Sequence, residues 1–316
     1  LAAAGCVALF YGSSELLTHS FLDAMTLVPL AGGLALIVVL LVYQYRAKRP
    51  LLCIRPLGST LPVSGIVVAM SAAASSISAV ALAAILLTNQ FTPVHLGLLQ
   101  FPEFIAALIT AVLLGVVFRS RGLHYLVLGG MLSLIAGILV LQSQLPPSSL
   151  HMALGSGLIG LGVGGSVAPA LFIAGFSLRN NALQRVFAII ELLRAVAAFS
   201  VAPILFHVAA TVGGSPAAGT HAALWICCGI ATTGTVFAVS LYALGRVRPP
   251  APNLEVWMSG EAPAWYSPPL LDRIRDSSRA RVLTEPLACD AGGQFGGPRD
   301  RDSAAPAAER PAGAVR

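Results

Sequence analysis

The chain has 316 residues, of which 56% are hydrophobic and only 10% are charged, and its mean hydropathy is +0.83. A water-soluble domain carries about 25% charged residues, so lipid rather than water must cover most of this surface. The formal net charge is +6, but no basic stripe with interleaved aromatic residues is present, which argues against nucleic-acid binding.

Apolar runs follow one another along the chain, each close to the roughly 20 residues that a helix needs to cross a bilayer. Eight are found, at approximately residues 2–19, 25–45, 61–87, 96–118, 123–141, 151–176, 186–210 and 221–244. They are continuous and lack the period-two alternation of a membrane β-barrel. The sequence therefore predicts an all-α, polytopic transmembrane helical bundle.

The loops between these runs alternate in charge. Every second loop is basic, and together the basic loops carry Arg46, Lys48, Arg49, Arg55, Arg119, Arg121, Arg179, Arg185, Arg246 and Arg248. The intervening loops, 20–24, 88–95, 142–150 and 211–220, contain neither Lys nor Arg. By the positive-inside rule, we expect the basic loops and the C-terminus to be cytoplasmic, in a plasma (inner) membrane protein.

The composition changes after Val247, where Pro, Ala, Gly, Arg and Asp become frequent and no periodicity is sustained. Such a segment buries too little apolar area to offset its ordering entropy, so residues 246–316 are predicted to be a disordered cytoplasmic tail. Within it, residues 257–271 carry Trp and Tyr, which favour the membrane interface. A plain loop is the alternative for this stretch, and we favour it.

Several loop and helix segments resemble a known transporter family in their order and spacing. They are KRPLLCIRPLGSTLPVSGIVVAM (48–70), TNQFTPVHLGLLQFPEFIA (88–106), FRSRGLHYLVLGGM (118–131), GSGLIGLGVGGSVAPALFIAG (155–175) and LRNNALQRVFAIIELLRAVAAF (178–199). Together these segments resemble the fourteen-helix drug:proton antiporter branch of the major facilitator superfamily, over residues 1–245. None of them is specific alone.

This resemblance implies a domain plan. Residues 1–45 match two linker transmembrane helices, 46–60 a basic cytoplasmic loop, and 61–245 the second six-helix half. The first half and its Gly-Pro signature have no counterpart here, so we expect a fragment, or a chain that needs a partner half or self-association. The implied function is proton-coupled efflux of drugs or other small molecules by alternating access. A non-transporting membrane scaffold or assembly partner is the alternative.

Ionisable residues inside spanning helices are costly and are functional candidates by default. Glu191 and Arg194 lie three residues apart, so they share a helix face and can pair. In the resembled fold this helix borders the central cavity, which makes the pair a candidate for the substrate or proton path. The alternative is a structural pair that joins the helix to a neighbour or to the interface.

Glu103 follows Pro102 within the run 96–118. A carboxyl group in an apolar site can exchange protons near neutral pH, as a coupling residue must. The alternative, an acid near the outer headgroups, is the one we favour.

Small residues mark the run 151–176. Gly160 and Gly164 form a small-xxx-small pair that allows helix backbones to approach closely, and Gly165 extends it, so packing or gating is the expected role. No strand precedes this glycine-rich run, which excludes a dinucleotide site. The cysteines and histidines show no metal-ligand spacing, and no nucleophile triad, HExxH or Walker motif occurs. We therefore expect no cofactor, no metal and no enzymatic activity.

Overall fold

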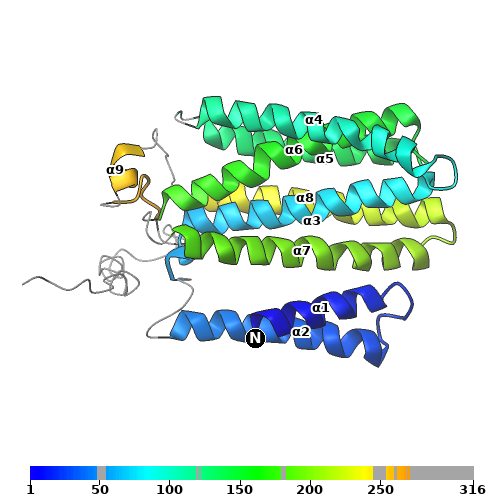
Figure 1. The fold of residues 1–316 in the computed structure, drawn as a ribbon, viewed down its shortest axis with the longest axis horizontal. Helices are drawn as coiled ribbons and strands as arrows, with labels where there is room; N and C mark the ends of the chain where they lie inside the picture. The colour runs from blue at the N-terminus through cyan, green and yellow to red at the C-terminus, as the bar shows by residue number, and fades with distance from the viewer. Residues whose placement is uncertain are drawn as a thin grey trace, which may run out of the picture.

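The computed structural model describes residues 1–47, 55–118, 120, 122–178, 183–244, 254–259, 262–268 and 270. These residues form helices and connecting loops without a β-strand, which confirms the predicted all-α bundle (Figure 1). The elements are α1 (Ala2–Glu15), α2 (Ala24–Arg46), a short 3-10 helix η1 (Arg55–Gly58), α3 (Thr60–Leu87), α4 (Pro93–Val117), α5 (Leu123–Ser143), α6 (Ser149–Phe176), α7 (Leu183–Thr211), α8 (Pro216–Leu244) and α9 (Leu254–Ser259).

Seven of the described helices, α2 to α8, are long and apolar enough to cross a membrane. The predicted eighth run, 2–19, is not among them. Its helix α1 covers 14 residues, from Ala2 to Glu15. The helix ends at Glu15, whose carboxylate lies 3.0 Å from Nδ1 of His19 in the following turn. The run 2–19 therefore stays a prediction as a membrane span.

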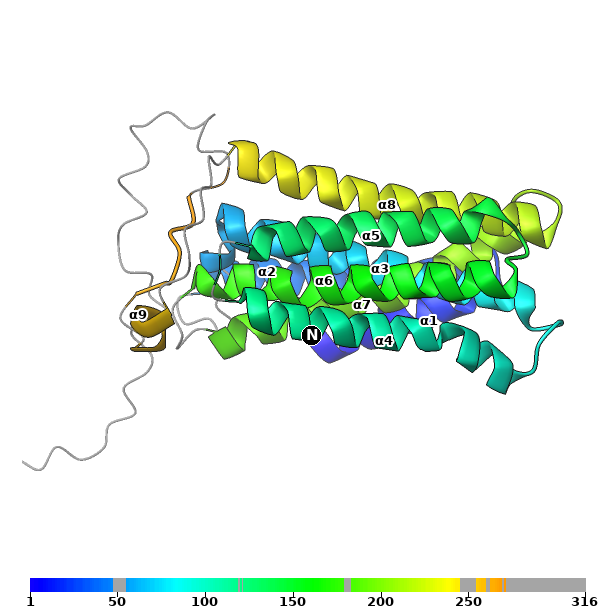
Figure 2. The same cartoon turned by 90° about the horizontal axis from the view of Figure 1, so that it is seen from above.

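Successive helices from α2 to α8 run in opposite directions (Figures 1 and 2). As a result, the helix ends that flank the basic loops all lie together. We call this the basic end; it contains the C-termini of α2, α4, α6 and α8 and the N-termini of α3, α5 and α7. The helix ends that flank the loops without Lys or Arg lie at the opposite end of the bundle.

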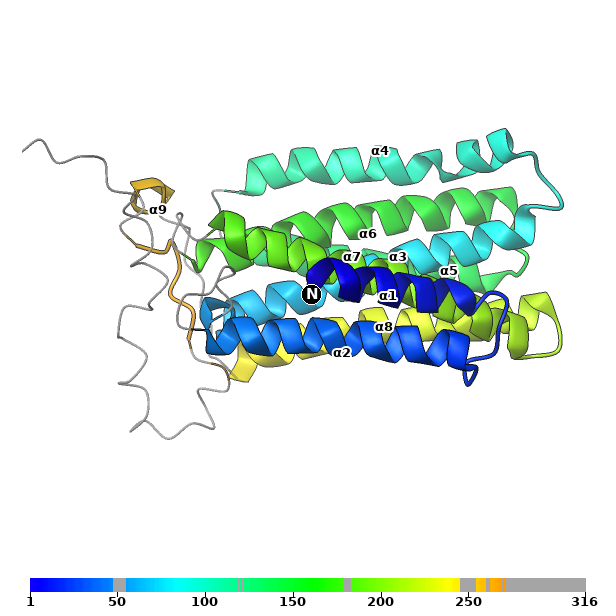
Figure 3. The same cartoon turned by 60° about the horizontal axis from the view of Figure 1, so that its bottom comes forward.

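Helices α3 and α6 occupy the centre of the bundle (Figure 3). They pack against each other, and each has two main further neighbours: α3 packs on α7 and α8, and α6 packs on α4 and α5. Most side chains of α3 are buried, because it is surrounded by helices rather than by lipid. Four of its buried hydroxyls donate to carbonyl groups of the same helix; they belong to Ser71, Ser75, Ser76 and Ser78.

Glycines on two faces of α6 allow its neighbours to approach closely. Toward α4, a Cβ atom on Gly160 would lie 2.7 Å from the Cα atom of Glu103, and one on Gly164 would overlap the hydroxyl of Thr110. Toward α5, a Cβ atom on Gly162 would lie 2.7 Å from the backbone nitrogen of Leu134. Two interhelical hydrogen bonds add to this packing: Ser133 donates to Leu158 (2.8 Å) and Ser156 to Leu99 (3.2 Å).

The first two helices form a hairpin that lies beside α7 (Figure 1). Within the hairpin, α1 and α2 approach closely at Gly12 and Gly33. A hydrogen bond of 2.8 Å between Nδ1 of His207 and the carbonyl oxygen of Leu16 joins α7 to the loop after α1. The hairpin is thus attached to the outside of the six-helix bundle α3–α8.

Part of the predicted disordered tail is ordered against the basic end. Residues 254–259 and 262–268, which we call the C-terminal strap, contact three helices of the bundle. The backbone nitrogen of Trp265 donates to the carbonyl of Phe176 (3.0 Å), and that of Thr60 donates to Pro268 (3.1 Å). The indole of Trp257 donates to the carbonyl of Leu178 (2.9 Å). In the strap, two Trp side chains supply apolar area that the average composition of the tail conceals.

The α4–α6 crossing can be tested by adding a single methyl group. In Gly160→Ala the new Cβ atom meets the backbone of Glu103, so α4 must move, and we expect a loss of about 1–3 kcal/mol in stability. Gly157→Ala is the control one turn away, because its Cβ atom would lie 3.4 Å from Pro102, an ordinary contact. Thermal unfolding of the two detergent-solubilised variants measures the stability of each against that of the unaltered chain. Equal melting temperatures would show that the crossing does not depend on Gly160.

Candidate functional site

The charged pair predicted on the helix after the third basic loop is formed in the structure. Nε of Arg194 donates to Oε2 of Glu191 at 2.8 Å, and Nη2 lies 2.7 Å from the same oxygen. The side chain of Arg194 is 32% exposed and that of Glu191 is 47% exposed, so the pair lies on the surface of α7. Its buried neighbours Ile189 and Ile190 belong to a hydrophobic cluster inside the bundle. The pair thus points away from the six-helix core.

Glu103, the second acidic candidate, lies in α4, and its backbone rests against Gly160 of α6. Its side chain is half-buried. Among the described residues, no salt bridge involves Glu103; the bridges found there are Glu191–Arg194 and Glu15–His19. The position combines a close helix crossing with a carboxyl group that lacks a cationic partner in the described part of the chain.

The structure does not bring these candidates into one site. Helix α4 packs on α6, whereas α7 packs on α3 and α8. The two central helices therefore separate Glu103 from Glu191 and Arg194 (Figures 1 and 3). Of the remaining candidates, Gly160 and Gly164 lie at the α4 crossing and Gly165 faces Gly130 of α5. All three occupy packing positions.

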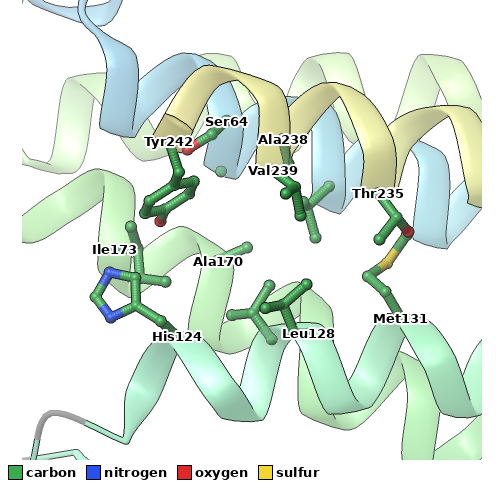
Figure 4. Close-up of a pocket in the computed structure, with 13 residues that line it drawn as sticks. Ser64, His124, Leu128, Met131, Ala170, Ile173, Thr235, Ala238, Val239 and Tyr242 are labelled. Carbon is green, nitrogen blue, oxygen red and sulfur yellow. The ribbon is translucent and has the colours of Figure 1, made fainter. Parts of the chain in front are cut away.

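A cavity of about 170 Å³ lies among α3, α5, α6 and α8, near the basic end (Figure 4). Its wall is mainly apolar, with polar atoms from a few side chains. The lining residues used below are Val127, Met131, Ala170, Ile173, Ala238 and Tyr242. Leu128 on α5 and Val239 on α8 also line it, and these are exposed on the outer surface. The cavity therefore reaches the edge between α5 and α8.

His124 is the unusual residue of this cavity. Both of its ring nitrogens are buried, and neither has a hydrogen-bond partner in the described structure. The ring lies edge-on to Tyr242, with centroids 5.4 Å apart, and against Trp265 of the strap, at 5.1 Å. Buried polar atoms are almost always paired, so an imidazole with two unpaired nitrogens beside a cavity is a candidate for ligand recognition.

His124 was not among the site residues predicted from the sequence. It lies at the start of a predicted span, as histidines at a membrane interface do, and nothing in the local pattern separates it from them. His151, for example, contacts the cap residue Ser148, and His221 lies 3.5 Å from Gln142. The distinguishing signal is the strap, which covers the ring from a position 141 residues later in the chain.

Comparison with known proteins adds no assignment. No protein-family model matches the chain, and no curated protein matches it. The structure establishes a multi-pass membrane protein with seven apolar helices in its described part.

The contact between the strap and the cavity wall can be tested with neighbouring residues. Trp265 is 2% exposed and Tyr266 is 81% exposed. In Trp265→Ala the buried indole is lost and the strap should detach, so we expect its backbone amides to exchange hydrogen at least about tenfold faster, which corresponds to about 1.4 kcal/mol. Tyr266→Ala should leave exchange unchanged. Hydrogen–deuterium exchange of the peptide spanning the strap measures this, and equal rates in both variants would contradict it.

Proposed function

We propose that the chain is the six-helix half of a proton-coupled secondary transporter of the major facilitator type, with a preceding helical hairpin. Its cargo would be a small amphipathic or cationic molecule, moved outward by alternating access. The observation that carries this proposal is the internal symmetry of helices α3–α8.

Helices α3–α5 and α6–α8 form two three-helix units with the same packing pattern. The first helix of each unit, α3 or α6, packs on the second and third helices of the other unit. The third helices, α5 and α8, also pack on each other. Because α3 begins at the basic end and α6 at the opposite end, the units are inverted relative to the membrane. Inverted three-helix repeats nested within a six-helix half are the architecture of major facilitator transporters.

The exposed ion pair on α7 supports a partner half. A charged pair inside a spanning helix is costly if it faces lipid, so such residues normally face protein or a water-filled cavity. Glu191 and Arg194 lie on the bundle surface, where a second six-helix half would cover them. In this arrangement the pair would lie on the transport path, which forms between two halves. The partner is either a separate N-terminal half or a second copy of this chain.

The orientation follows from the loop charges. All predicted basic loops join helix ends at the basic end, and Lys and Arg favour the cytoplasmic side of spanning segments. We therefore assign the basic end, the strap and the C-terminus to the cytoplasm, in a plasma membrane. A non-transporting scaffold remains the competing function, and it requires the same topology but no dependence on the charged residues.

Topology can be tested by cysteine labelling in intact cells. In a variant whose native cysteines are replaced by Ser, Ser215→Cys at the opposite end should react with a membrane-impermeant maleimide. Ser120→Cys at the basic end should react only after the membrane is permeabilised. These two serines are exposed in loops, so burial does not protect either one. Labelling of both from outside would contradict the assigned orientation.

Transport can be tested in proteoliposomes that contain the chain and carry a pH gradient. We expect accumulation of ethidium, a cationic amphiphile, that requires the gradient. Glu191→Gln should reduce this accumulation at least tenfold, because the carboxylate that holds Arg194 is lost. Glu103→Gln should reduce coupling to the gradient if Glu103 carries protons. Glu15→Gln, at the C-terminus of α1 and away from the bundle α3–α8, is the matched control and should behave as the unaltered chain.

Two outcomes would contradict the proposal. Gradient-independent distribution of ethidium in the unaltered chain would remove proton-coupled transport by this chain on its own or as a self-associated assembly. Unchanged coupling in both Glu191→Gln and Glu103→Gln would remove the proposed roles of these carboxylates. A scaffold function would be favoured if the double variant Glu191→Leu, Arg194→Leu also kept full biological activity.

A further inference from the structure

We propose that the cavity beside His124 is a binding site for a small, uncharged molecule with an apolar body and one hydroxyl group, entering from the bilayer. A single-ring phenol has this chemistry. The site lies inside the six-helix bundle and not on the α7 surface that carries the ion pair. The proposal therefore stands independently of the transport function.

The size of the cavity limits the ligand. Its volume is about 170 Å³, comparable to an apolar protein cavity of about 150 Å³ that holds one benzene molecule. The side chains of Val127, Met131, Ala170, Ile173 and Ala238 provide the apolar wall. One six-membered ring with a small substituent matches this volume, whereas a fused-ring drug or a full acyl chain exceeds it.

The polar group of the ligand follows from the hydrogen-bonding capacity of the wall. Neutral imidazole offers one N–H donor and one nitrogen acceptor, and both nitrogens of His124 are unpaired. The neighbouring Thr235 hydroxyl already donates to Ala231, at 2.8 Å, and Ser64 donates to Leu61, also at 2.8 Å. The hydroxyl of Tyr242 has Ser64 as its partner. Among the described residues that line the cavity, His124 is thus the one whose buried polar atoms lack a partner.

An uncharged hydroxyl fits this corner better than other polar groups. A hydroxyl can donate to one imidazole nitrogen or accept from the other, so it suits either tautomer. A carboxylate or ammonium group would lose its hydration in an apolar cavity and gain no opposite charge, which is far more costly. Among the described residues that line the cavity, none is a carboxylate, Lys or Arg.

The route of entry is set by the exposed edge of the cavity. Leu128 and Val239 line the cavity, yet they are 38% and 45% exposed on the bundle surface. Both belong to apolar spanning helices, so lipid covers this surface. At the basic end, the strap closes the polar corner, since Trp265 lies against both His124 and Phe176. A ligand that partitions into the bilayer would therefore enter between α5 and α8, with its hydroxyl toward the basic end (Figure 4).

The proposal can be tested with 4-fluorophenol and the full chain in nanodiscs. Fluorine-19 NMR relaxation should report saturable binding that excess unlabelled phenol displaces. Ala238→Leu fills the cavity and should weaken binding at least tenfold. Ala243→Leu, on the exposed side of the same helix, should leave binding unchanged within twofold. Size-exclusion and thermal unfolding profiles show whether each variant is folded.

The hydroxyl contact has its own test, because His124→Phe keeps a ring in the same place but removes both nitrogens. We expect the affinity for 4-fluorophenol to fall about three- to tenfold, the range of one net hydrogen bond. The affinity for fluorobenzene, which has no hydroxyl, should stay the same or rise. This comparison uses two ligands in one variant, so a general loss of folding would affect both.

Three outcomes would overturn the proposal. Absence of saturable binding to the unaltered chain, beyond partition into empty nanodiscs, would show that water or protein alone occupies the cavity. An equal loss of binding in Ala238→Leu and Ala243→Leu would place the ligand on the lipid-facing surface. An equal change for both ligands in His124→Phe would remove the hydroxyl contact as the basis of recognition.

Discussion

Close approach of helix backbones around α6 is the constraint on which the rest of this structure depends. Lipid is as apolar as a leucine side chain, so helices in a membrane gain little by burying such residues against one another. They associate through packing at short distance and through hydrogen bonds between helices. The glycines on two faces of α6 permit this contact with α4 and α5, and the carbonyl of Leu158 accepts the interhelical bond of Ser133.

The same constraint explains where polar groups are tolerated. In α3 the serine hydroxyls are buried but harmless, because each donates to a carbonyl one turn earlier in its own helix. Glu191 and Arg194 satisfy each other on the bundle surface. His124 differs from both groups, since its ring is buried without either kind of partner. Its unpaired nitrogens therefore indicate a binding role, although nothing in the neighbouring sequence distinguishes His124 from the other histidines.

The C-terminal strap connects these features. It brings Trp257 and Trp265 to the basic end, where they pack around Phe176 at the C-terminus of α6. Its hydrogen bonds reach Thr60 at the start of α3 and Leu178 after α6. The strap, which follows α8 in the chain, thereby connects α3 and α6 at the basic end. This arrangement also closes the corner of the cavity that contains His124.

The fold class and most helix positions were determined by the sequence, because each apolar run must form its backbone hydrogen bonds within itself in lipid. The predicted run 61–87 and the helix Thr60–Leu87 differ by one residue at the start. Loop charges also determined which helix ends lie together, since each short loop joins two antiparallel neighbours. The pairing of Glu191 with Arg194 was predictable for the same local reason, a separation of three residues on one helix.

Only the tertiary structure decided which residues meet across long stretches of chain. It separated Glu103 from Glu191, because α3 and α6 lie between their helices. It placed Trp265 against His124, beside the cavity that this histidine lines. It also showed that part of the tail is ordered. Composition averages over a segment, whereas docking of the strap depends on two indoles that fit one surface, and such fit is a property of three-dimensional packing.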